Sequence, residues 1–328
     1  MNKELDLWQF VHDRLVQSQP VMLLVVTEST GSSPGRQGYK MAVGANGELM
    51  GSIGGGVMEV RLVEQSRAIL SEPGAVGTGF RDGSIKDQVH QKQSPHASGM
   101  ICSGRQTVIF KKLDAGDHAA IKSVIASFEN HNPHSLTITS TQFHGGPPKS
   151  GTLSEDYFFE RTPDGEFLYQ ERLGPKNNLY IIGGGHCALA LSEMMSSMDF
   201  RISIFDDRPE LNTIEKNRFA DEIFIVDAYE NIGALIPLGR QTYVVVMTLG
   251  YKFDEAVVRA LFEKDFHYFG VLGSKAKMKT LLKALEKDGF ARERLARIHT
   301  PIGLPINSHT PEEIAVSIAA EIIAVKNS

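Results

Sequence analysis

The pattern of apolar and polar positions changes near residue 175. Before that point it predicts an amphipathic helix over residues 3–18, a buried strand at 21–27, and mixed strands and helices up to about 172. After it, short apolar runs near 179–182, 201–205, 222–226, 243–248 and 268–272 alternate with helical patterns. Because Gly174-Pro175 separates the two patterns, we expect domains at residues 1–175 and 179–328.

These patterns predict an α/β protein. We expect an N-terminal α+β domain followed by a C-terminal Rossmann-like domain with a doubly wound parallel sheet. Residues 82–99 are polar and poor in large apolar side chains, which predicts an exposed loop. Thr310-Pro311-Glu312-Glu313 combines a capping hydroxyl, an early proline and a glutamate at the third position, so it predicts the start of the final helix.

A glycine motif follows the first strand of the second half. Gly183, Gly185 and Ala188 fit G-x-G-x-x-G/A, in which the backbone can approach a pyrophosphate at a helix N-terminus. The next apolar run ends on Asp206, where a ribose-binding acid is expected, and Asp207 follows it. The order of strand, glycines, helix, strand and acid predicts a nucleotide site. The alternative is a doubly wound domain with an empty site.

Two further glycine-rich loops lie in the first half. The first offers hydroxyls and a guanidinium, and the second precedes a helix whose positive end favours phosphate. Glycines of this kind are also what a tight turn requires. We predict an anionic ligand at Ser32, Ser33, Gly35 and Arg36, and at Gly54, Gly55 and Gly56. For Glu59, in the first turn of that helix, the favoured role is a capping or solvated carboxylate.

Other candidate groups are individual side chains. Ser274 and Lys275 begin a helix after a strand, where the lysines either hold an anion or form a wet surface. Cys102, close to Arg105, is either a thiolate suited to a soft metal or a small buried apolar residue. His186 either faces a phosphate or is merely hydrogen-bonded. Cys187 is interpreted as a packing residue.

Composition and absent motifs exclude several classes. A net charge of -5 argues against a general nucleic-acid binder, and no apolar run approaches the roughly 20 residues of a membrane span. The polar, acidic N-terminus is unlike a signal peptide, and two cysteines are too few for a disulfide framework, so we expect a cytoplasmic protein. The sequence has no nucleophile elbow, zinc helix, Walker A loop or evident hydride-transfer residues.

The motifs together resemble the XdhC/CoxI family of accessory factors for xanthine dehydrogenase and related molybdenum hydroxylases. The resemblance rests on the segments Gly31–Gly35, Gly51–Glu59, Gly183–His186, Asp206–Pro209, Gly270–Lys275, His299–Leu304 and Thr310–Ile318. The sequence departs from the family pattern at three places. Ser103 replaces a glycine in the family's Cys-Gly-Gly motif, Tyr251 stands near a usual histidine, and Asn307-Ser308-His309 replaces Ile-Gly-Ala.

The resemblance implies a chaperone rather than a catalyst. Such proteins bind the molybdenum cofactor (molybdopterin), protect it during sulfuration with a cysteine desulfurase, and deliver it to apo-xanthine dehydrogenase or a related hydroxylase. A homodimer is expected on the same ground, and the glycine motif leaves NAD(P) or another adenine nucleotide open as a ligand. We expect the ligand in a cleft between the domains, with Cys102 as a metal ligand and no catalytic residue. The cofactor-binding candidates are Ser32, Ser33, Gly35, Arg36, Gly54, Gly55, Gly56, Cys102, Gly183, Gly184, Gly185, His186, Asp206, Asp207, Ser274 and Lys275. The alternatives are an NAD(P)-dependent oxidoreductase and an interaction scaffold with structural glycines.

Overall fold

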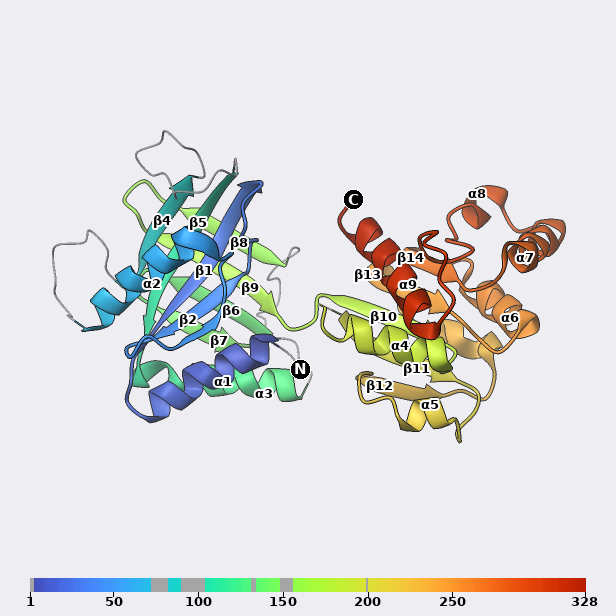
Figure 1. Cartoon of the computed structure of the whole chain (residues 1–328), viewed down its shortest axis with the longest axis horizontal. Helices are drawn as coiled ribbons and strands as arrows, with labels where there is room; N and C mark the ends of the chain where they lie inside the picture. Colours follow the sequence, from blue (N-terminus) through green and yellow to red (C-terminus); the bar gives the residue numbers. More distant parts are fainter. Residues whose placement is uncertain (1–2, 72–81, 90–103, 131–133, 148–155, 199) are drawn as a thin grey trace. The chain divides into compact units, whose positions relative to one another are not determined.

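The chain folds into two compact units. The computed structural model describes every residue except 1–2, 72–81, 90–103, 131–133, 148–155 and 199 (Figure 1). Backbone contacts divide it into Met1–Gly174 and Pro175–Ser328. Within the described parts of both units, no helix is both long enough and apolar enough to cross a membrane.

The first unit contains two antiparallel sheets. The strand order is β3-β2-β1-β5-β4 in the five-stranded sheet and β7-β6-β9-β8 in the four-stranded sheet. The elements of this unit are α1 (Lys3–Val16), β1 (Val21–Gly31), β2 (Lys40–Gly44), β3 (Leu49–Gly51), α2 (Gly56–Ser71), β4 (Ser84–Val89), β5 (Gly104–Leu113), the 3-10 helix η1 (Ala115–Asp117), α3 (His118–Glu129), β6 (His134–Thr139), β7 (Phe143–Gly146), β8 (Tyr157–Arg161) and β9 (Phe167–Leu173).

The central strand β1 is buried on both faces, which explains its unbroken apolar run. Val21, Leu23 and Val25 face a core shared with α1, α3 and the four-stranded sheet. The intervening side chains, such as Met22 and Leu24, face a second core under α2. Successive strand residues point to opposite faces, so a strand with cores on both sides needs apolar residues throughout.

One expectation for this unit is wrong. Residues 82–99 were expected to form a loop, but Ser84–Val89 form strand β4, which pairs antiparallel with β5. A strand at the edge of a sheet is held through its backbone and needs little apolar surface, so its sequence shows no apolar alternation. Residues 90–99 lie outside the described residues.

The second unit is a parallel α/β domain, as predicted. Its five-stranded sheet has the order β12-β11-β10-β13-β14, and all its strand pairs are parallel. The elements are β10 (Asn177–Ile182), α4 (His186–Met195), β11 (Phe200–Asp206), α5 (Asn212–Glu215), β12 (Glu222–Ile225), the 3-10 helix η2 (Tyr229–Ala234), β13 (Gly239–Val246), α6 (Tyr251–Leu261), β14 (Phe266–Val271), α7 (Lys275–Lys287), α8 (Arg292–Leu295) and α9 (Pro311–Lys326).

Helices cover both faces of this sheet (Figure 1). Alternate strand residues pack with α4 and α9 on one face and with η2, α6 and α7 on the other. This arrangement confirms the doubly wound, Rossmann-like fold. The predicted start of the last helix is also confirmed, because Thr310 and Glu313 form a reciprocal capping box.

Candidate functional site

The glycine loop after β10 leaves the sheet at its topological switch point. β10 pairs with β11 on one side and with β13 on the other, and open α/β sheets bind ligands outside the carboxyl ends of strands at such a point. Gly183 has a φ of +105°, and a Cβ there would lie 2.3 Å from the Met247 carbonyl oxygen. Only glycine therefore fits between the two strand ends.

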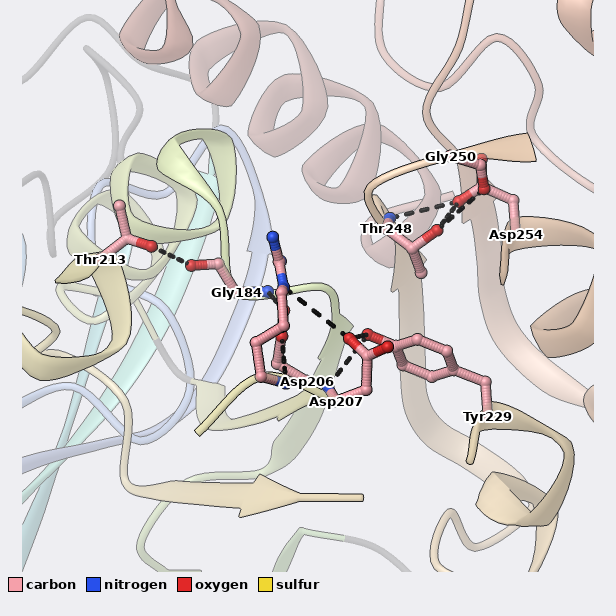
Figure 2. A network of polar contacts seen from close by, with 9 residues as sticks. Gly184, Asp206, Asp207, Thr213, Tyr229, Thr248, Gly250 and Asp254 are labelled. Carbon is pink, nitrogen blue, oxygen red and sulfur yellow. Dashed lines mark hydrogen bonds and ion pairs between the residues drawn. The ribbon is translucent and has the colours of Figure 1, made fainter. Parts of the chain in front are cut away.

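The Asp206 carboxylate is already engaged inside the protein (Figure 2). It is fully buried, and the Gly184 N–H donates to Oδ2 at 2.6 Å. The Arg208 backbone N–H and Nε donate to Oδ1 at 2.9 and 2.8 Å, and Arg208 Nη2 donates to Oδ2 at 2.8 Å. Burial raises the pKa of Asp206, but the hydrogen bonds from Arg208 and Gly184 outweigh it and hold this pKa below the ordinary value. The ionised Asp206 carboxylate thus holds the glycine loop in place through the Gly184 N–H. Its contact with a ribose, predicted from the sequence, stays a prediction.

Neighbouring side chains complete the support of this loop. The Thr213 hydroxyl donates to the Gly184 carbonyl oxygen at 2.5 Å, and a Cβ on Gly184 would lie 2.6 Å from Ile214. The Tyr229 hydroxyl donates to Asp207 Oδ1 at 3.2 Å, as Figure 2 shows. Asp207 is only partly buried, so it is the more accessible of the two aspartates.

A second buried carboxylate fixes the loop after β13. Asp254 is fully buried, and its Oδ1 accepts from the Thr248 hydroxyl at 2.5 Å and from the Thr248 N–H at 3.2 Å. Its other oxygen accepts from Lys277 Nζ at 2.5 Å. Sequence reasoning missed Asp254, although an acid in the first turn of a helix after a strand is a recognisable signal.

The two helices beside the switch point begin without a side-chain cap. The N-cap residues of α4 and α6 are Gly185 and Gly250, and neither supplies a capping side chain. A Cβ on either glycine would meet no described atom within 4 Å. Helix N-termini carry partial positive charge and free N–H donors, so these two ends can receive an anionic group.

The side chains at the start of α4 differ in accessibility. His186 is exposed at the first position of the helix. Cys187 is half-buried against the core beneath α4, and burial followed by the charge of Glu312 raises the pKa of its thiol. Cys187 is therefore a neutral packing residue, in agreement with its interpretation from the sequence.

The third predicted loop is occupied by its own side chains. Ser274 caps α7 by accepting from the Lys277 N–H at 3.3 Å, and Lys277 forms the ion pair with Asp254 described above. Lys275 is exposed. The two lysines therefore have separate roles, and the one with a buried partner supports the β13 loop.

In the first unit, the two predicted loops pack against each other backbone to backbone. A Cβ on Gly35 would lie 2.2 Å from the Ile53 carbonyl oxygen, and one on Gly54 would lie 2.5 Å from the Gly35 nitrogen. The buried Gln106 amide joins them: its Oε1 accepts from the Ser33 hydroxyl at 2.7 Å and from the Gly35 N–H at 3.2 Å. Gln106 Nε2 donates to the Ile53 carbonyl oxygen at 3.3 Å. Sequence reasoning missed Gln106, whose signal is a polar residue at the start of a buried strand.

The Glu59 carboxylate accepts hydrogen bonds from backbone N–H groups of the second loop, which contains Gly54, Gly55 and Gly56. Its Oε2 accepts from the Ser52 hydroxyl at 2.7 Å, from the Ile53 N–H at 2.9 Å and from the Gly55 N–H at 3.0 Å. Glu59 thus has the capping role favoured from the sequence. The Ile53 and Gly55 N–H groups, which would have been donors to a bound ligand, therefore donate to the Glu59 carboxylate instead.

The remaining candidates of this unit lie near the ends of β1 and β5. Arg36 Nη1 donates to the Gly31 carbonyl oxygen at 3.4 Å, and the exposed Ser32 follows Gly31. Gly104 pairs with Gly31 and packs against the Ser33 backbone. Cys102 lies outside the described residues. Among the residues the structure describes, no group of three or more His, Cys, Asp or Glu side chains is arranged to hold a metal ion.

Comparison with known proteins identifies relatives of both units. Residues 179–322 match the family model of the XdhC Rossmann domain, and residues 15–78 match that of the XdhC and CoxI family. A probable xanthine dehydrogenase subunit of Bacillus subtilis is 24% identical, with 96% of each chain covered. The molybdenum cofactor insertion chaperone PaoD of Escherichia coli is 21% identical over 97% of this chain and 87% of PaoD.

Two other matches bear on length and fold. The uncharacterized protein YqeB of Escherichia coli is 24% identical over 95% of this chain, which spans only 44% of that relative. A crystal structure of a xanthine dehydrogenase from Bacillus halodurans has a TM-score of 0.69 and 22% identity, covers 100% and 96% of the two chains, and so shares the fold. With one matching family model in each unit, in the same order along the chain, the protein belongs to the XdhC and CoxI family.

Proposed function

We propose that this chain is a maturation chaperone for molybdenum hydroxylases. In this proposal it binds the molybdenum cofactor, protects it during sulfuration and delivers it to xanthine dehydrogenase or a related enzyme. The pair of uncapped helix ends at Gly185 and Gly250 carries the proposal, because it offers an anion site at the switch point of the sheet. The names of two relatives, a molybdenum cofactor insertion chaperone and a probable xanthine dehydrogenase subunit, support the choice of cofactor.

The glycine loops of the two units differ in how well they could hold the phosphate of an anionic pterin. The space beyond Gly185 is open, whereas the N–H groups of Ile53 and Gly55 are bound by Glu59. We therefore propose that the phosphate binds at Gly183–His186 and that Asp206 positions this loop without touching the ligand. A second contact with the anionic cofactor remains proposed at Ser32, Ser33 and Arg36. The loop Gly54–Gly56 can contact the cofactor only if the Glu59 carboxylate moves away from its N–H groups.

The thiol of Cys102 is proposed as the contact to the metal. A thiolate is the ligand a soft metal centre prefers, and Gly104, two residues along the chain, packs on the Ser33 loop. The cofactor, once delivered, supplies the redox-active metal of the recipient enzyme. The carrier's own residues would bind the phosphate and hold the pterin away from water.

Mass spectrometry of released small molecules tests this function. The full chain is purified from a molybdate-replete host as wild type, Cys102→Ala and Cys187→Ala. We expect molybdopterin in the wild type, severalfold less in Cys102→Ala, and an unchanged amount in Cys187→Ala, the matched control at the other cysteine. Wild-type protein without any pterin contradicts the function, and equal loading of both variants contradicts the role of the Cys102 thiol.

The partners follow from the same proposal. A chaperone of this kind would act in the cytoplasm, bind a cysteine desulfurase and an apo-hydroxylase, and form a homodimer. Co-purification from cells expressing both partners, together with light scattering of the isolated chain, measures these associations. Failure of either partner to co-purify contradicts the corresponding step.

A second candidate is an NAD(P)-dependent oxidoreductase, which the Rossmann-like sheet and the open start of α4 favour. Against it, both oxygens of Asp206 accept hydrogen bonds from Gly184 and Arg208, so neither is free for a ribose. Equilibrium dialysis with NADPH and a turnover assay distinguish the two functions. Hydride transfer by the purified chain would favour the oxidoreductase.

A further inference from the structure

A separate pocket of the second unit lies along β14, away from the glycine loop. It has a volume of about 420 Å³ and is lined by β14, by the turn that precedes it, by Arg294 and by residues 296–299. Small-molecule pockets typically enclose about 300–1,000 Å³, so one compact ligand fits. Its described lining shares no residue with the Asp206 and Asp254 networks.

One wall of this pocket is aromatic and preformed. Phe262, Phe266 and Phe269 line it. Phe266 and Phe269 meet edge to face with ring centroids 5.6 Å apart, and Phe262 packs in the same way on Phe290 at 4.6 Å. Phe262 is only 7% exposed and has the Arg294 guanidinium over its ring, so the partly exposed rings of Phe266 and Phe269 are the apolar surface that a planar ligand would contact.

The other wall is positively charged. Lys264, Arg294 and Arg297 line it together with a single carboxylate, Asp265. Asp265 lies at 3.0 Å from Arg294 and 3.9 Å from Arg297, and its side chain is 75% exposed. Lys264 Nζ donates to the uncharged carbonyl oxygen of Ile236 at 2.6 Å. Arg294 is also paired with Glu263 at 3.1 Å, so Lys264 and Arg297 are the cations left to favour an anion in a chain whose net charge is -5.

His299 adds an imidazole of fixed orientation. Its ring stacks on Tyr268 at 4.6 Å, and its Nδ1 lies 3.6 Å from Glu321 Oε1. Glu321 also accepts from the Tyr268 hydroxyl and from the Gly303 N–H at 3.0 Å. Because Glu321 contacts Nδ1 of His299, the other ring nitrogen, Nε2, can bind a different partner. His299 lines the pocket, so that partner can be a ligand in it.

We propose that this pocket binds a small aromatic anion of mononucleotide size. The planar ring lies against the phenylalanines, and the anionic group contacts Lys264, Arg297 and His299. The proposal is independent of the molybdenum cofactor, because it uses none of the residues assigned to that site. It gives a ligand-binding role to His299, the first residue of the His299–Leu304 motif, which the proposed function leaves without one.

Isothermal titration of the full chain with 5′-AMP tests the proposal, and adenosine and inorganic phosphate serve as partial probes. We expect 5′-AMP to bind more tightly than either probe, because only 5′-AMP engages both walls. Arg297→Ala and His299→Gln should each raise its Kd about tenfold, the effect of one lost charge-assisted contact. The Arg297 side chain is 75% exposed, so its removal leaves the fold intact.

Two controls make the result specific. Arg292, whose side chain is 84% exposed, lies on α8 outside the pocket, and Arg292→Ala should leave the Kd unchanged. Gly185→Ala alters the glycine loop and should also leave it unchanged. No measurable binding of 5′-AMP overturns the proposal, as does a Kd unaffected by both pocket variants. A Kd that rises only in Gly185→Ala assigns 5′-AMP to the glycine loop and overturns it too.

Discussion

The glycine loops of the two units have similar composition but opposite accessibility. In the first unit, the loops at Gly35 and Gly54 pack against each other, and Glu59 accepts from the second loop's N–H groups. In the second unit, Gly184 is the one glycine of the loop whose N–H donates to Asp206 among the hydrogen bonds described, and the helix start at Gly185 stays open. A glycine-rich loop before a helix therefore indicates an anion site only where no internal carboxylate takes its donors.

The chain's single tryptophan allows the two units to be followed separately. Trp8 is fully buried in the core of the first unit, so its fluorescence reports unfolding there. Circular dichroism at 222 nm reports both units. A variant in one unit can thus be assigned to that unit by whether the two signals move together.

The largest expected effect comes from adding a methyl group between the closed loops. Gly35→Ala places a Cβ 2.2 Å from the Ile53 carbonyl oxygen, so the backbone must shift, at a cost of about 3 kcal/mol in the free energy of unfolding. Urea denaturation followed by Trp8 fluorescence measures this loss. An unchanged midpoint would show that the two loops are not packed as described.

A smaller loss of folding stability is expected from neutralising the Asp206 carboxylate, which positions the glycine loop at Gly183–Gly185. Asp206→Asn weakens charge-assisted hydrogen bonds to Gly184 and Arg208 and should cost about 2 kcal/mol. The folded-state pKa of Asp206 lies below its unfolded value, so its contribution is present above about pH 4 and is lost as the pH falls through the folded pKa. Denaturation followed at 222 nm should thus separate wild type and variant at pH 7 and bring them closer at pH 3. A gap of equal size at both pH values contradicts this role.

Removing the internal anion should convert the closed loop into an open one. Glu59→Ala frees the N–H groups of Ile53 and Gly55 and should cost about 1 kcal/mol, as for a lost helix cap. Sulfate should then raise the melting temperature of this variant more than that of the wild type, because the anion replaces the carboxylate. The same response to sulfate in both proteins would show that the loop binds no external anion.

The smallest change in stability is expected at the open helix start. A Cβ on Gly185 meets no described atom within 4 Å, and φ is -70°, so Gly185→Ala should shift the free energy of unfolding by less than about 0.5 kcal/mol. The added methyl group nevertheless occupies the space proposed for a phosphate, and the yield of bound molybdopterin should fall. A destabilised Gly185→Ala would mean that this end is packed rather than open.

The inner strands of the second unit, β10, β11 and β13, were predictable because they are buried on both faces. Leu179 and Ile181 face one core and Ile182 the other, so the apolar run is continuous. The edge strand β4 was not predictable, since it pairs with β5 through its backbone and through polar contacts of Asp87 with Thr107 and Arg105, which leave no apolar pattern. Apolar patterning detects burial, and an edge strand can form with little of it.

For the site, the glycine positions were predictable and their partners were not. Gly183 and Gly184 stand out in the sequence, but the bond from Gly184 to Asp206 joins residues 22 positions apart. Gln106 contacts Ser33, 73 positions away, because β5 pairs with β1. Such long-range hydrogen bonds depend on strand pairing, which local patterns do not specify.

The Gln106 amide also has a consequence for the motions of the first unit. The Gly35 N–H donates to a fully buried oxygen, although Gly35 itself belongs to a loop between strands. Amide hydrogens in surface loops usually exchange with deuterium at low opening free energy, whereas this one is released only when the Gln106 side chain leaves the core. Gly35 should therefore exchange as slowly as the central residues of β1, which makes this loop part of the most protected region of the unit.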